Sequence, residues 1–226
     1  MIGISRRCVP FTPFEKELSS TTVTLVSNAG IHLPDQEAFP TEDPGDISYR
    51  VIPGDANVGE MKIAHHHYNH SEADGDPNIV FPLETLRELA EEGFIKAVND
   101  KHYTWGFTTR LKELYETTLP EIADQIDRSK TKLVLLTAGC PGTCHRSISN
   151  AAREIEAMGI PTLIISASPS ETEAVKPPRG VTFKETGIGR IVGGAGDREL
   201  HKRLIKAALE TFLQNTPPGK VVERDG

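Results

Sequence analysis

Two cysteines four positions apart are the residues of this chain best suited to covalent chemistry. Cys140 and Cys144 lie where an apolar run, residues 132–136, gives way through a Gly/Pro/Thr turn to a helical pattern. A thiol near the first turn of a helix feels the positive end of the helix dipole, which lowers its pKa and favours the reactive thiolate. The sequence therefore predicts a reactive thiolate or a reversible disulfide, with two small buried side chains at a tight turn as the structural alternative.

The spacing and the neighbours of these cysteines refine the prediction. Their Cys-x3-Cys spacing differs from the Cys-x2-Cys pattern of thioredoxins, so the Pro141-Gly142 turn must bring the two sulfurs together if they are to bond. His145 and Arg146 follow directly. We take Cys140 and Cys144 as candidate catalytic residues, and His145 and Arg146 as candidate substrate-binding residues.

A second group of chemically capable residues is rich in histidine, because four of the eight histidines fall between positions 65 and 70. In an extended segment His65 and His67 would point the same way. One interpretation is that His67 and His70 bind substrate or transfer protons. Another is that His65, His67 and His70 hold a divalent metal such as zinc together with Cys140 and Cys144, since sulfur and imidazole both suit that ion. An exposed polar loop is the structural alternative.

The elements around the cysteines predict an α/β fold. A β-branched apolar run at residues 22–27 and the run at 132–137 indicate buried strands, and residues 144–158 indicate a helix that leads to a further strand at 162–166. Such a strand–helix–strand unit makes its two strands parallel. We expect a mainly parallel sheet with helices on both faces, flavodoxin- or Rossmann-like, with the cysteines at the carboxyl end of a strand, where such folds build their sites.

The remaining pattern is less regular. The sequence predicts further helices, short strands, and loops that include a structural glycine-rich segment at 187–197. The expected helices are 83–92, 107–114, 121–129 and 200–212, the last with Asp197 as N-cap; the short strands are 61–64, 181–183 and 190–192; the loops are 34–60, 65–78 and 168–180. We expect one domain over residues 1–226, with a frayed tail at 215–226.

The overall composition argues against several classes of protein. The 226 residues carry 25 Lys+Arg against 32 Asp+Glu, for a formal charge of -7, which argues against general binding to nucleic acid or to anionic membranes. Three cysteines are too few for a disulfide-stapled fold, and no apolar run approaches transmembrane length. With no apolar segment typical of a signal peptide near the N-terminus, we expect a cytoplasmic protein.

Several motifs, in order along nearly the whole chain, resemble the selenoprotein B family of glycine/sarcosine/betaine and D-proline reductases. The segment from His67 to Leu83 is the most specific of them. The motifs lie at Pro10–Pro13, Val23–His32, Ser48–Pro53, His67–Asp74, Asn78–Leu83, Leu86–Leu89, Gly142–Arg146, Pro177–Arg179 and Gly194–Asp197.

The resemblance implies a reductase. In this family a selenocysteine attacks the substrate carbon that bears nitrogen, aided by a carbonyl (pyruvoyl) group on a partner subunit, and thiols recycle the enzyme. The selenocysteine directly precedes Gly-Thr-Cys, and that position is Pro141 here. Cys144 matches the nearby cysteine, Ser147 stands where a D-proline-reductase-like chain carries a further one, and Cys140 is shifted by one position from the selenium site.

We therefore expect a cysteine-containing member that lacks the selenocysteine. Cys140 would be the nucleophile and Cys144 the resolving thiol, although their roles could be exchanged. The expected reaction is cleavage of a C–N or related C–X bond of a small amino-acid-like substrate. The expected partners are a reductase subunit or a thiol reductant, in a homo-oligomer. A non-catalytic subunit on the same scaffold is the remaining alternative.

Overall fold

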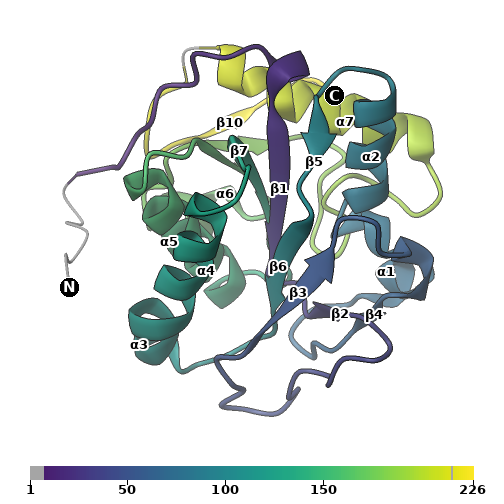
Figure 1. The fold of residues 1–226 in the computed structure, drawn as a ribbon. Helices are drawn as coiled ribbons and strands as arrows, with labels where there is room; N and C mark the ends of the chain where they lie inside the picture. Colours follow the sequence, from purple (N-terminus) through teal and green to yellow (C-terminus); the bar gives the residue numbers. More distant parts are fainter. Residues whose placement is uncertain (1–7, 215) are drawn as a thin grey trace.

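A computed structural model describes residues 8–214 and 216–226 of the chain. Its centre is an eight-stranded sheet in the order β10-β9-β8-β7-β1-β6-β3, with β5 also paired to β1 (Figure 1). The pairings are parallel except for β3 with β6. The strands are β1 (Thr22–Ser27), β3 (Tyr49–Pro53), β5 (Ala97–Val98), β6 (Lys101–Trp105), β7 (Leu133–Thr137), β8 (Thr162–Ile165), β9 (Gly180–Thr182) and β10 (Val221–Glu223).

Helices cover both faces of this sheet, which confirms the predicted flavodoxin/Rossmann-like α/β class. The helices α4 and α5 pack together on one face, and α2 and α7 pack together on the other (Figure 1). The helices are α1 (Ser71–Gly75), α2 (Leu83–Glu91), α3 (Leu111–Glu113), α4 (Leu119–Asp127), α5 (Thr143–Ala157), α6 (Pro169–Glu173) and α7 (Arg198–Glu210). None of these described helices is long and apolar enough to cross a membrane.

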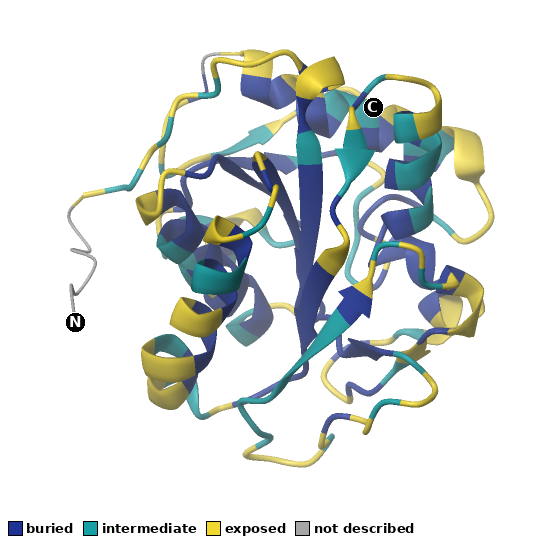
Figure 2. Cartoon of the chain, in the orientation of Figure 1, coloured by how far each residue is buried: buried dark blue, intermediate teal, exposed yellow. Residues whose placement is uncertain are grey.

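The core lies along the central strands. All of β7 is buried, as is β1 from its second residue onward, and Figure 2 shows these strands in dark blue between helices with exposed outer faces. A strand that is covered on both faces must be apolar along its length instead of alternating. This is why the runs at 22–27 and 132–137 were recognisable as strands, and the structure places both where they were predicted.

The strand–helix–strand unit around the cysteines is also confirmed. The strands β7 and β8 are parallel, and α5 connects them. The helices predicted at 83–92, 121–129 and 200–212 form as α2, α4 and α7 within two residues at most of their boundaries, and the Asp197 side chain accepts from the Leu200 N–H at 3.1 Å as the expected N-cap.

Other predictions were wrong. The expected loop at 34–60 contains the antiparallel strand β3, which escaped recognition because only one of its five residues is buried. Strands β5 and β6 were not predicted, and α6 lies within the expected loop at 168–180. The expected strand at 190–192 is a turn closed by reciprocal backbone bonds between Gly187 and Arg190.

The tail is not frayed as predicted. Val221–Glu223 forms β10, which extends the sheet in parallel beyond β9. The Glu173 carboxylate accepts from the backbone N–H of Val221 at 3.0 Å and from Lys220 Nζ at 3.1 Å. These contacts with α6 add to the strand pairing, and they anchor a segment whose short apolar stretch gave little sequence signal.

Candidate functional site

The cysteines lie at the point where the connections of the sheet change direction. From β1 the chain passes to the face that carries α2, whereas from β7 it enters α5 on the opposite face (Figure 1). The loops after β1 and β7 therefore diverge, and open α/β sheets bind ligands at this kind of switch point, outside the carboxyl ends of the strands. Asn28–Gly30 follows β1, and Ala138–Gly142 follows β7. The sequence-based placement of the cysteines is thus confirmed.

The two cysteine sulfurs are in direct contact. Cys140 Sγ lies 2.8 Å from Cys144 Sγ, and both residues are free thiols that are only 2% exposed. One thiol can donate a hydrogen bond to the other across this distance. The Cys-x3-Cys spacing therefore does bring the sulfurs together, because the turn at 140–143 reverses the chain into the first turn of α5.

Asn28 fixes the geometry of the cysteine loop. Its side-chain Oδ1 accepts from the Gly139 N–H at 3.0 Å, and its Nδ2 donates to the Cys144 carbonyl and to Ser147 Oγ, both at 2.8 Å. Asn28 is fully buried, so these bonds are made without competition from water. One amide therefore ties the loop after β1 to both ends of the segment that carries the thiols.

Close packing requires a glycine before the first cysteine. A Cβ at Gly139 would lie 3.0 Å from Ala29 Cα and 3.0 Å from Tyr68 Cε1. Tyr68 is held there because its hydroxyl donates to the Ala29 carbonyl at 2.9 Å, and burial raises its pKa so that it remains a protonated donor. The loop after β1, the loop after β7 and Tyr68 thus form one packed unit.

A small second sheet brings the histidine segment to this unit. It pairs β2 (Ile31–His32) with β4 (Lys62–Ile63), and the Ala64 N–H donates to the Gly30 carbonyl at 2.9 Å. Gly30 has φ +78°, and a Cβ there would lie 2.4 Å from the Ala64 carbonyl oxygen. Only glycine permits this approach, and it places His65 next to the thiols.

His65 is the histidine of the predicted cluster that reaches the cysteines. Its Nε2 lies 3.3 Å from Cys144 Sγ, and its Nδ1 accepts from the backbone N–H of His67 at 3.1 Å. The Cys140 sulfur is also within 4.8 Å of this imidazole. The sequence indicated that His65 could bind a metal or a substrate anion, and its contact with a thiol is a feature that the structure adds.

The pKa values of the two thiols are shifted in opposite directions. A hydrogen bond from the Cys144 thiol lowers the pKa of Cys140 to about 5, against the opposing effect of burial. Burial, together with the neighbouring Cys140 sulfur, raises the pKa of Cys144. Burial also lowers the pKa of His65. Near neutral pH these directions give a Cys140 thiolate, a protonated Cys144 and a neutral His65.

The other predicted histidines face away from the thiols. The His67 ring stacks on Phe107 with 3.5 Å between ring centroids, and its Nε2 lies 3.6 Å from Asp43 Oδ1. His70 Nδ1 lies 2.8 Å from Asp74 Oδ1. Each of these two imidazoles has an acidic partner, and although the His67 ring lies 5.9 Å from the His65 ring, His65 is the one whose nitrogen contacts a thiol.

The side chains of His145 and Arg146 point to different partners. His145 is fully buried, its Nδ1 lies 2.7 Å from the Cys140 carbonyl oxygen, and its Nε2 accepts from the Ala167 N–H at 3.2 Å. Both ring nitrogens therefore bind backbone, which leaves neither for a substrate. Arg146 Nε donates to Glu171 Oε2 at 2.6 Å on the surface. His145 supports the shape of the cysteine loop, and Arg146 joins α5 to α6.

The structure brings together three of the five residues of the predicted metal site. His65, Cys140 and Cys144 offer ligand atoms within 4.8 Å of one another, but His67 and His70 are engaged elsewhere. Two sulfurs bound to one tetrahedral zinc ion would lie about 3.8 Å apart, given Zn–S bonds of about 2.3 Å, whereas these lie 2.8 Å apart. Because Nδ1 of His65 accepts an N–H, Nε2 carries the proton of the neutral ring, and that proton would have to be released for Nε2 to bind a metal.

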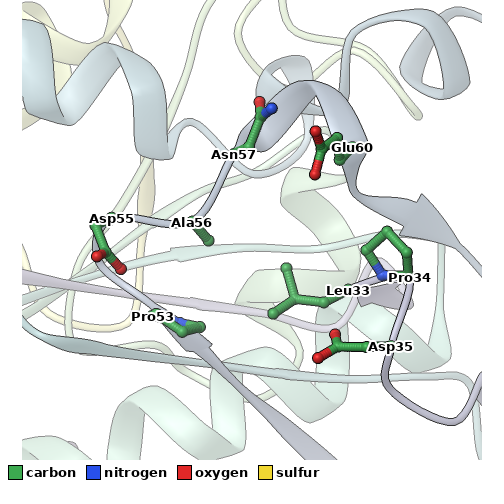
Figure 3. Close-up of a pocket in the computed structure, with 8 residues that line it drawn as sticks. All are labelled: Leu33, Pro34, Asp35, Pro53, Asp55, Ala56, Asn57 and Glu60. Atoms are coloured by element: carbon green, nitrogen blue, oxygen red, sulfur yellow. The ribbon is translucent and has the colours of Figure 1, made fainter.

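A cavity of about 370 Å³ lies elsewhere, against the end of β3 and the segment after β2 (Figure 3). Apolar side chains form part of its wall, and three carboxylates belong to its lining. It is lined by Leu33, Pro34, Asp35, Pro53, Asp55, Ala56, Asn57 and Glu60. None of these residues belongs to the thiol site, so this cavity does not hold a substrate against the cysteines.

The family model and the relatives that match this chain point to one family. Residues 5–139 match the model of the family described as glycine/sarcosine/betaine reductase selenoprotein B (GRDB), a match that ends directly before Cys140. The chain is 39% identical to the D-proline reductase subunit gamma of Acetoanaerobium sticklandii over 213 residues, which is 94% of this chain and 86% of that protein.

Two further relatives are longer. The glycine reductase complex component B subunit gamma of Symbiobacterium thermophilum is 30% identical over 69% of this chain and 37% of its own length. The sarcosine reductase complex component B subunit beta of Peptoclostridium acidaminophilum is 26% identical over 95% of this chain and 50% of its own length. The chain therefore spans half or less of these two relatives. No solved structure matches it.

Proposed function

Because this chain belongs to the glycine/sarcosine/betaine reductase selenoprotein B family, we propose that it is the thiol-bearing subunit of a reductase complex. The complex cleaves a C–N bond, or a related C–X bond, of a small amino-acid-like substrate. D-Proline is the first substrate to test, because the D-proline reductase subunit gamma is similar over 94% of this chain and 86% of its own length.

The observation that carries this proposal is the contact between the two thiols at the switch point of the sheet. Cys140 and Cys144 lie 2.8 Å apart, and a hydrogen bond between them favours the thiolate of Cys140. A thiolate is the nucleophilic form of cysteine, and a second thiol in contact with it can complete a two-electron reduction by forming a disulfide. Pro141 occupies the position of the family's selenocysteine, so Cys140 takes the nucleophile's role here.

The reaction proceeds in two steps. The Cys140 thiolate attacks the substrate carbon that bears nitrogen; a C–S bond forms, the C–N bond breaks, and the amine leaves with the electron pair and takes up a proton. That proton comes from Cys144, and the Cys144 thiolate so formed attacks Cys140 Sγ; an S–S bond forms, the C–S bond breaks, and the carbon keeps the electron pair and takes a proton from solvent. The substrate gains two electrons, and the two thiols lose them.

Two further components complete the cycle. An external dithiol reduces the Cys140–Cys144 disulfide and is itself oxidised to a disulfide. We assign activation of the substrate nitrogen to a partner subunit, since the relatives are components of multi-subunit reductases by their names.

The test is turnover of D-proline by the complex assembled with its partner subunits and a dithiol. We expect Cys140→Ser and Cys144→Ser each to lower the rate by at least ~100-fold, because each removes one half of the thiol pair. Cys8→Ser is the matched control, since Cys8 is exposed and outside the site, and it should retain full activity.

The two variants should also differ from each other. Cys144→Ser should accumulate a covalent adduct on Cys140 that carries the full mass of the substrate, because opening a ring releases no fragment. Cys140→Ser should form no adduct. Full activity in both variants would overturn the proposal and would favour a non-catalytic subunit on the same scaffold.

A further inference from the structure

We infer that His65 serves the thiol pair as a fixed hydrogen-bond donor to Cys144, and not as a base. This inference rests on the proposed function, since it assigns a role in the disulfide chemistry of that same pair. It makes His65 a catalytic residue that touches a reacting atom. His65 also assists the departure of Cys144 when the disulfide is reduced by attack on Cys140.

The hydrogen bonds of the imidazole fix the position of its proton. The backbone N–H of His67 donates to His65 Nδ1 at 3.1 Å, so that nitrogen must present its lone pair. In the neutral ring the proton then lies on Nε2, and Nε2 is the atom that lies 3.3 Å from Cys144 Sγ. A nitrogen that already carries a proton donates to the sulfur and cannot take a proton from it.

The packing around the ring prevents the other arrangement. His65 is only 1% exposed, and its ring meets Tyr68 edge-on at 4.7 Å and Phe107 at 5.9 Å between centroids. A flip of the ring would direct a C–H toward the His67 N–H and lose that bond. The donor that fixes the tautomer lies only two residues away in the same loop, so ring and donor move together.

The three groups form a directed chain of hydrogen bonds. The His65 Nε2–H points to Cys144 Sγ, and Cys144 in turn lies 2.8 Å from Cys140 Sγ. A donor aimed at Cys144 stabilises negative charge on that sulfur, as charge-assisted hydrogen bonds do. His65 also interacts with Cys140 and helps to lower the pKa of that thiol, but the direct contact of its Nε2, at 3.3 Å, is with Cys144 Sγ.

This arrangement sets the direction of disulfide reduction. A dithiol attacks Cys140 Sγ, a new S–S bond forms to Cys140, and the Cys140–Cys144 bond breaks. The electron pair passes to Cys144 Sγ, where the His65 N–H meets the new thiolate before solvent supplies its proton. Burial and the Cys140 sulfur disfavour the Cys144 thiolate, so a donor at this sulfur should speed its departure relative to a protein that lacks the donor.

The test uses the isolated full chain, oxidised at Cys140 and Cys144 and then reduced by a small dithiol, with the rate followed by mass spectrometry between pH 6 and 8. His65→Gln keeps an amide N–H that can reach the sulfur but does not titrate, and it should stay within ~3-fold of wild type. His65→Leu removes the donor, and it should be at least ~10-fold slower. His66→Gln is the matched control, because the His66 ring is exposed and approaches only Glu42, at 4.0 Å.

Three outcomes would overturn the inference. The donor is irrelevant if His65→Leu is as fast as wild type, and a titrating imidazole is required if His65→Gln is as slow as His65→Leu. If wild-type protein forms no Cys140–Cys144 disulfide, the proposed function fails and this inference fails with it. Should His65→Leu not fold, as judged by circular dichroism, His65→Met supplies the same comparison with a flexible apolar side chain.

Discussion

The cysteine loop, residues 137–147, and the histidine loop, residues 65–70, are both dense in reactive side chains, yet they differ in how the fold uses them. In the cysteine loop both thiols are buried and in contact. The carbonyl of Cys144 is bound by Asn28, and the carbonyl of Cys140 is bound by His145. In the histidine loop His65 turns inward, whereas His67 and His70 bind carboxylates toward the surface.

The difference follows from where each loop leaves its sheet. The cysteine loop follows a central strand between two helical layers, so most of its side chains, including both thiols, are buried, whereas Pro141 and Arg146 are exposed. The histidine loop follows β4 of a two-stranded sheet, and only His65 and Tyr68 of its residues are buried, held by the contact of Ala64 with Gly30 and by the bond of Tyr68 to Ala29. Proximity in sequence therefore says less about shared chemistry than the position of a residue at the end of a buried strand.

The sharpest test of this contrast is the pH dependence of thiol reactivity in reduced protein. Because the pKa of Cys140 is lowered to about 5 by the hydrogen bond from Cys144, its thiolate persists as pH falls and is lost only near pH 5. At pH 6.5 alkylation of Cys140 should remain near its plateau rate, whereas an ordinary thiol with pKa about 8.5 falls to about 1% of its plateau. Peptide-resolved alkylation kinetics measure this, and a midpoint near pH 8.5 would contradict it.

Removal of the Asn28 amide should destabilise the cysteine loop strongly. Asn28→Ala leaves the buried Gly139 N–H without its acceptor and removes the donors to the Cys144 carbonyl and to Ser147 Oγ, which should cost about 2–4 kcal/mol of unfolding free energy. The matched control comes from the histidine loop: Asn69→Ala loses one exposed bond to the Ser71 N–H and should cost less than about 1 kcal/mol. Urea denaturation measures the unfolding free energy of both variants. Equal decreases would show that side-chain bonds matter no more in the cysteine loop than in the histidine loop.

A smaller loss is expected from a single added methyl group. Gly139→Ala places a Cβ 3.0 Å from Ala29 Cα and Tyr68 Cε1, so the loops must separate slightly, at about 1–3 kcal/mol. Gly75→Ala, with nothing within 4 Å of the new Cβ, is the control. Thermal unfolding compares the two variants, and an unchanged midpoint for Gly139→Ala would show that the site is less tightly packed than described.

The smallest effects should come from the outward histidines. His67→Ala and His70→Ala remove partly exposed pairs with Asp43 and Asp74, which should change the unfolding free energy by less than about 1 kcal/mol. Alkylation of Cys140 at pH 6.5 should stay within ~3-fold of wild type. A larger loss of thiol reactivity in either variant would show that the histidine loop acts on the thiols as a group.

The fold could be predicted from sequence where burial is continuous. The strands β1, β7 and β8 and the helix α5 carried clear apolar patterns, and Asp197 marked the start of α7. Strand β6 carried none, because its buried positions include polar side chains such as His102, whose Nδ1 accepts from the Leu25 N–H at 2.8 Å. A partner that lies 77 residues away in the chain leaves no local signal.

The site was predictable to a similar extent. Thiols at a strand-to-helix turn pointed to the correct end of the sheet, but the choice among four neighbouring histidines depended on the contact of Gly30 with Ala64. Asn28 could have been suspected as a polar residue directly after a buried strand, since parallel strands end at one edge of the sheet. Its three specific bonds could not, because they join β1 to a loop more than 110 residues later.

The most direct test of the thiol pair is alkylation of freshly purified protein, with and without reductant and with and without chelator, resolved by peptide mass spectrometry. If the two cysteines form a redox couple, Cys140 and Cys144 of oxidised protein should react only after reduction, and chelator alone should have no effect. If chelator alone exposes both thiols, they were holding a metal, and the account of a redox pair positioned by Asn28 and His65 is wrong.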